Sequence, residues 1–123
     1  MSSQSNTFEA VFHRLKIILQ AYESALVLKA DVPGNYYLDT PYAPKYRKEL
    51  FFGAVQIKKN YVSYHLMPVY IYPDLLEGIS SQLRKRMQGK SCFNFKAIDE
   101  ALFEELTRLT ERGFARIKDE ALS

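Results

Sequence analysis

The chain has 123 residues, of which 47% are hydrophobic and 25% are charged, and its formal net charge is +3. These proportions are typical of one ordinary globular domain with a real core, and they exclude disorder for most of the chain. One cysteine cannot form an internal disulfide, which is typical of a reducing compartment. The small positive charge falls well short of a nucleic-acid signature.

No apolar run approaches the roughly 18 residues that a membrane-spanning helix needs. The first residues, MSSQSNT, are polar and uncharged, where a signal peptide would be basic and then apolar. We therefore expect a cytoplasmic protein without membrane association. Residues 1–6 are expected to be flexible, and residues 7–122 to form a single domain.

Helical periodicity predicts a first helix from about Thr7 to Ser24, opened by a capping-box spacing at Asn6-Thr7-Phe8-Glu9. Alternating residues then predict a hairpin over residues 26–40 that turns at Val32-Pro33-Gly34-Asn35. The prolines of Pro41-Tyr42-Ala43-Pro44 predict a loop into the next hairpin.

The second hairpin can be aligned from its own pattern, because Lys59-Asn60 suits a two-residue turn. Side chains of a strand alternate between its two faces. One predicted face pairs Ile57 with Val62, Val55 with Tyr64 and Gly53 with Leu66, and it is expected to face the core. The other pairs Lys58 with Tyr61, Gln56 with Ser63, Ala54 with His65 and Phe52 with Met67.

After Pro68 the sequence predicts an extended segment over 69–72 and a helical turn at Pro73. A helix is predicted from Ser80 to Met87, ended by Gly89. A strand over 92–95 and a last helix capped by Asp99 follow. This order of elements predicts an α+β fold. We expect an antiparallel sheet of about five strands, with N-terminal and C-terminal helices packed on it.

Four segments together carry a family resemblance, which spans roughly residues 29–113: Phe52-Gly53, Tyr61 to Leu66, Met87-Gln88-Gly89-Lys90 and Ser91 to Phe95. In this order they resemble the YdhG-like domain family of small, mostly uncharacterised bacterial proteins. The resemblance implies a compact α+β domain. Because one member is associated with iron handling as a frataxin-like chaperone, it also implies an iron carrier as one alternative function.

An iron carrier would need exposed oxygen ligands, for which the last helix offers Asp99, Glu100, Glu104, Glu105 and Glu111. Glu104 also stands four residues before Arg108, a spacing that favours a surface ion pair. A solvated helical face is therefore favoured, and no metal site or cofactor is predicted.

The second face of the hairpin is the predicted site. Its ligand-binding candidates are Phe52, Gln56, Tyr61, Ser63, His65 and Met67. An apolar floor with a few polar groups is the composition of a small-molecule pocket. The same composition suits a face covered by a helix or by a partner in a homodimer, and both alternatives stay open. A homodimer seam could also run along Tyr70-Ile71-Tyr72-Pro73.

Two other functions are considered and not favoured. Ser63 and His65 lack a nearby acid for an enzyme mechanism, and Cys92 is expected in the core. The basic and aromatic residues around Tyr42 to Lys48 are of the kinds that bind single-stranded nucleic acid. The basic residues Arg84 to Arg86, however, would point in three directions on a helix and would not form one binding surface. The sequence therefore favours a binding or carrier domain for a small molecule or a protein partner.

Overall fold

The computed structural model describes the backbone of residues 3–122 and the side chains of residues 7–122. Six antiparallel strands form one sheet in the order β1-β2-β3-β4-β6-β5. The strands are β1 (Val27–Val32), β2 (Asn35–Ala43), β3 (Lys48–Ile57), β4 (Val62–Leu66), β5 (Met87–Gln88) and β6 (Cys92–Phe95). The helices are α1 (Ser3–Gln20), α2 (Met67–Ile71), α3 (Ser81–Arg84) and α4 (Glu100–Glu120), with 3-10 turns η1 (Glu23–Ala25) and η2 (Pro73–Leu76). The predicted α+β fold is confirmed, with six strands in place of about five.

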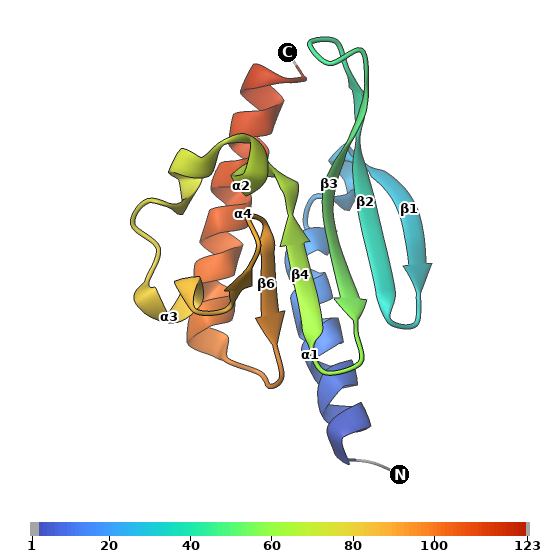
Figure 1. The fold of residues 1–123 in the computed structure, drawn as a ribbon. Coiled ribbons are helices and arrows are strands. Elements are labelled where there is room, and N and C mark those ends of the chain that lie inside the picture. Colours follow the sequence, from blue (N-terminus) through green and yellow to red (C-terminus); the bar gives the residue numbers. More distant parts are fainter. Residues whose placement is uncertain (1–2, 123) are drawn as a thin grey trace.

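Both long helices cover the same face of the sheet, behind the strands in Figure 1. Each presents an apolar stripe to the sheet, and the buried residues of the stripes include Phe8, Val11, Leu15 and Leu19 of α1 and Leu102, Phe103, Leu106 and Ile117 of α4. Burial of these side chains drives the packing of the helices on the sheet. No helix in the described part of the chain covers the opposite face, which we call the open face.

The prediction of a first helix is confirmed, but the ends of the helix differ from the predicted ones. It begins at Ser3, ahead of Thr7, and it ends at Gln20, where a turn and η1 lead into β1. The expected flexible terminus covers residues 1–6. The side chains of these residues, and the backbone of residues 1 and 2, lie outside the described part of the chain.

The predicted loop at Pro41 to Pro44 is mostly strand. Strand β2 continues to Ala43, and Tyr42 and Ala43 pair with Glu49 and Lys48. The register of this pairing shifts between Asp39 and Tyr42, so Pro41 lies at an irregular position where its missing N–H group removes no ladder hydrogen bond.

The predicted register of the central hairpin is confirmed. Gly53 pairs with Leu66, Val55 with Tyr64, Gln56 with Ser63 and Ile57 with Val62. The Lys58 backbone N–H donates to the Tyr61 carbonyl at 2.8 Å and closes the two-residue turn. Val55, Val62, Tyr64 and Leu66 are fully buried under the helices, as expected for the core face.

The predicted place of Phe52 on the second face of the hairpin is wrong. In the pairing of β2 with β3, Leu38 lies opposite Gly53 but Asp39 lies opposite Phe51. This bulge skips Phe52 and turns it toward the helices, where it is fully buried and its ring contacts Tyr22 and Phe114. An irregularity of this kind exchanges the two faces for every residue beyond it.

The pairing of Phe52 with Met67 is also wrong. Strand β4 ends at Leu66, and Met67 begins α2, so the expected extended segment over 69–72 is largely helical. Pro68 suits this start, because its fixed φ angle and missing N–H are compatible with the first turn of a helix.

The segment before β6 also differs from the prediction. Helix α3 ends at Arg84, and Met87 and Gln88 form β5, which pairs with β6 at the end of the sheet. Ser80 caps α3 as predicted, since its hydroxyl accepts from the Leu83 N–H at 3.1 Å. Strand β6 and the Asp99 cap of α4 are confirmed.

Candidate functional site

Two rows of side chains cross the open face. The first row, which we call the polar row, joins four strands and consists of Asn35, Gln56, Ser63 and Asn94. The second lies beside it and consists of Tyr37, Ala54, His65 and Cys92. Because antiparallel pairing places these residues directly opposite one another, the register fixes both rows.

His65 is held by two neighbouring side chains. Its Nε2 atom lies 2.7 Å from the Ser91 hydroxyl oxygen, and its ring meets the Phe51 ring edge-on with centroids 4.8 Å apart. Phe51 in turn lies against Tyr37 at 4.7 Å. Burial lowers the pKa of His65, and the positive charge of Lys58 lowers it further. The neutral imidazole is therefore favoured, with Ser91 rather than Ser63 as its partner.

The open face is hollowed beside His65. This hollow, which we call the amide hollow, has a volume of about 220 Å³. It is lined by Gln56, Lys58, Tyr61, Ser63, His65, Gln88, Cys92 and Asn94. Four of the six predicted site residues, Gln56, Tyr61, Ser63 and His65, thus lie together, whereas Phe52 is in the core and Met67 is in α2.

Hydrogen bonds fix most of the amides in this hollow. Gln56 donates to the Asn35 side-chain oxygen at 3.0 Å, and Asn94 donates to the Gln88 side-chain oxygen at 2.6 Å. The Asn94 Oδ1 atom is buried and accepts no hydrogen bond within the described residues. A buried acceptor without a donor is costly, but this atom is enclosed and is not itself exposed to a ligand in the hollow.

A second hollow of about 320 Å³ adjoins the first, and we call it the basic hollow. It is lined by Tyr61, Lys85, Arg86, Met87, Gln88, Asn94 and Lys96, of which Tyr61, Gln88 and Asn94 also line the amide hollow. Sequence reasoning missed this part of the site because it assigned residues 85–87 to a helix.

The charged residues that line the two hollows are all cations: Lys58, Lys85, Arg86 and Lys96. None of the four forms an ion pair with another described side chain. Five cations elsewhere do form ion pairs, as where Lys16 meets Asp31 at 2.6 Å. The hollows therefore concentrate positive charge that no ion pair in the described structure neutralises.

The far end of the open face carries charges of both signs. Asp39 lies beside Phe51, and Glu49 lies 3.5 Å from Lys29. Burial raises the pKa of Asp39, and Glu49 raises it further while Lys29 lowers it. These carboxylates disfavour an anion at this end of the face, compared with the end that carries the two hollows.

Cys92 differs from its expected place in the core. It is half-buried, lies opposite His65 and lines the amide hollow. Phe93 and Phe95 take the core side of β6, so alternation turns Cys92 and Asn94 to the open face.

The acids of α4 are largely engaged by neighbouring side chains. Arg14 donates to both carboxylate oxygens of Glu100 at 2.8–3.1 Å, and Glu105 accepts from the Ser80 N–H and hydroxyl at 2.6 and 2.7 Å. Among the described residues, no three His, Cys, Asp or Glu side chains are placed to hold a metal ion together.

Comparison of the chain with protein-family models, with curated proteins and with solved structures returned no significant match. The YdhG-like resemblance therefore stays a prediction. None of the helices within the described residues is long and apolar enough to cross a membrane. Of the predicted homodimer seam, Tyr70 is 54% exposed and Tyr72 is buried.

Proposed function

We propose that the protein is a binding module for a small anionic ligand with a flat polar body, a nucleotide being the simplest example. The ligand would occupy the amide hollow and the basic hollow together. The observation that carries this proposal is the set of four unpaired cations around two hollows that share Tyr61, Gln88 and Asn94.

The positive charge supports an anionic ligand. Lys58, Lys85, Arg86 and Lys96 have no carboxylate partner in the described structure to displace. Guanidinium groups match phosphate and carboxylate geometry with two parallel hydrogen bonds, whereas lysines act as point charges. Arg86 lies between the basic hollow and the neighbouring surface at Lys96 and Asp99, and it is the strongest single candidate for the anion.

The uncharged lining supports a flat polar body. Tyr61 belongs to both hollows and offers an aromatic surface, on which heterocycles stack favourably. Gln56, Gln88 and Asn94 offer amide donors and acceptors. Ring N–H or amino groups of a ligand would match the accessible amides of Gln56 and Gln88.

Charge elsewhere on the face favours a small ligand over the alternatives. A nucleic-acid strand crossing the sheet would meet Asp39 and Glu49 at the far end, so the anion-binding surface is short. The iron-carrier alternative draws no support from the Glu100 and Glu105 carboxylates, which already bind Arg14 and Ser80. His65 gives little support for an enzymatic function, because no described carboxylate is hydrogen-bonded to it.

Isothermal titration calorimetry with adenosine monophosphate, adenosine and inorganic phosphate tests the proposal. Adenosine monophosphate should bind more tightly than either fragment. Arg86→Gln should weaken its binding roughly tenfold, which is the typical scale for a lost hydrogen bond to a charged group. Added salt should weaken binding as well, because the cations are exposed to solvent.

The matched control is Arg112→Gln, which removes the same charge from an exposed position on α4, on the opposite side of the sheet. This variant should bind like the parent chain. An equal loss of affinity in both variants would show that binding depends only on the net charge of the chain, which contradicts a specific site. The proposal is overturned if none of the three probes binds.

A further inference from the structure

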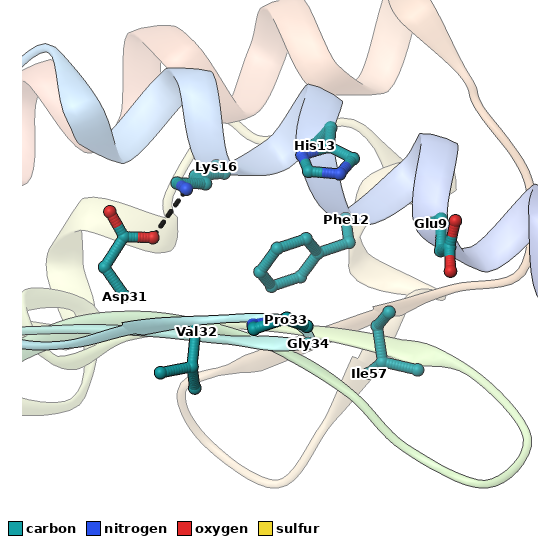
Figure 2. Close-up of a pocket in the computed structure, with 9 residues that line it drawn as sticks. All are labelled: Glu9, Phe12, His13, Lys16, Asp31, Val32, Pro33, Gly34 and Ile57. Atoms are coloured by element: carbon teal, nitrogen blue, oxygen red, sulfur yellow. Dashed lines mark hydrogen bonds and ion pairs between the residues drawn. The ribbon is translucent and has the colours of Figure 1, made fainter.

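A larger hollow of about 660 Å³ lies on the helix side of the sheet, between α1 and the turn that joins β1 to β2. Figure 2 shows Phe12 reaching from α1 toward Pro33, with Ile57 beside them. Pro33 and Ile57 supply most of the apolar floor of the hollow, and Phe12, which is 2% exposed, lies beneath it. The volume of the hollow is within the range of about 300–1,000 Å³ that is common for small-molecule sites.

Charged side chains lie at both ends of this hollow in Figure 2. At one end Lys16 binds Asp31 at 2.6 Å, and the Lys16 ammonium also lies 5.2 Å from the centre of the Tyr36 ring. The Lys16 side chain is only 17% exposed. Its charge is therefore compensated by the chain itself and is not free to hold a ligand.

At the other end the Glu9 carboxylate forms neither a hydrogen bond nor an ion pair with a described side chain. Since Lys16 and Asp31 cancel each other, Glu9 is the one carboxylate among the described lining residues without an ion-pair partner. His13, one turn further along α1, is the other titratable group that lines the hollow. A group that is positively charged and attached to an apolar body complements the Glu9 carboxylate and the apolar floor.

We propose that this hollow is a second ligand site, which takes an organic amine. Its apolar body lies over Phe12, Pro33 and Ile57, and its ammonium group meets Glu9. The site is separate from the hollows of the open face, from which the sheet divides it, and it requires the opposite ligand charge.

Three probes of the same shape and different charge test this site: phenylbutylamine, phenylbutanol and phenylbutyrate. Two-dimensional ¹H–¹⁵N NMR spectra of the labelled chain would follow the backbone amides of His13, Val32 and Gly34, which line the hollow. The amine should shift these amides and bind about threefold more tightly than the acid, the scale of one exposed ion pair. The alcohol should fall between them.

Substitution of Glu9 separates the charge effect from the apolar one. Glu9→Gln should bring the amine and the acid to nearly equal affinity, and Glu9→Lys should reverse their order. The control Glu77→Gln removes an exposed carboxylate outside the hollow and should leave the preference for the amine unchanged. The spectra also show whether each variant is folded.

The proposal is overturned if none of the probes shifts the amides of the hollow at millimolar concentration. It is equally overturned if the acid binds the parent chain as tightly as the amine, or if the order stays the same in Glu9→Lys. None of these outcomes depends on whether adenosine monophosphate binds the open face. The two proposed sites are therefore tested independently.

Discussion

His65 links the pH of the solution to the stability of the fold. Its pKa is lowered from 6.5 by burial and by Lys58, so the unfolded chain binds this proton more readily than the folded chain. The contribution of His65 to the free energy of unfolding is therefore fully present above about pH 6.5 and is lost as the pH falls through the lower folded-state pKa.

We predict that urea unfolding shows falling stability below pH 6.5 and that His65→Gln flattens this fall, because the substitution removes the titrating group. His13→Gln removes the other histidine, which is exposed on α1, and separates an effect of His65 from the loss of a histidine in general. A pH profile that is unchanged in His65→Gln would contradict the assignment.

Tyr64 and Thr110 form the buried polar contact between the sheet and α4. Their hydroxyl oxygens are 2.6 Å apart, and both residues are fully buried. Tyr64→Phe should lower the free energy of unfolding by about 1–2 kcal/mol, because the Thr110 hydroxyl loses its partner. Chemical denaturation of the variant measures this loss.

The double variant Tyr64→Phe/Thr110→Val provides the control. Because both polar groups are then absent, its loss of stability should be smaller than the sum of the two single losses. Strict additivity would show that the hydroxyls do not depend on each other.

At the scale of elements, two glycines set how closely neighbouring segments approach. A Cβ atom at Gly53 in β3 would lie 3.0 Å from the His65 carbonyl oxygen and 3.2 Å from the Leu19 side chain. A Cβ atom at Gly113 in α4 would lie 3.0 Å from the Cβ atom of Pro68. Both contacts are tighter than an alanine normally allows.

Gly53→Ala should therefore destabilise the chain by about 1–3 kcal/mol, the usual range for overpacking. Gly113→Ala should cost less, because alanine gains about 1 kcal/mol over glycine within a helix. Thermal unfolding of the two variants gives the comparison. If Gly53→Ala matched or exceeded the parent chain in stability, the close packing of α1 against β3 would be in doubt.

Elements whose signals are local could be predicted from the sequence. The turn at Lys59-Asn60 and strict alternation gave the correct register of the central hairpin, and with it the grouping of Gln56, Tyr61, Ser63 and His65. The caps at Ser80 and Asp99 are likewise read from single residues.

Features that depend on tertiary contacts could not be predicted in the same way. The bulge that buries Phe52 arises from pairing with β2, and alternation within β3 alone carries no sign of it. Met67 could extend β4 or begin a helix, and packing of α2 on α4 decides between them. The short strand β5 forms only because β6 lies beside it, so Lys85 and Arg86 could not be joined to Tyr61 in advance.

At the scale of the whole molecule, the sheet separates two surfaces of different charge. The open face gathers Lys58, Lys85, Arg86 and Lys96 at one end, and the α1 side presents Glu9 above an apolar floor. The helices leave the open face free because their apolar stripes need only one face of the sheet. Ligand binding can therefore be altered there without disturbing the core.

The most direct measurement is a two-dimensional NMR titration of the labelled chain with adenosine monophosphate. We predict that the largest shifts fall on the amides of Tyr61, Gln88, Asn94 and Lys96, and that Arg86→Gln weakens the response while Arg112→Gln preserves it. Shifts scattered over the surface, shifts centred on Val32 and Gly34, or no shifts at all would contradict an anion site on the open face.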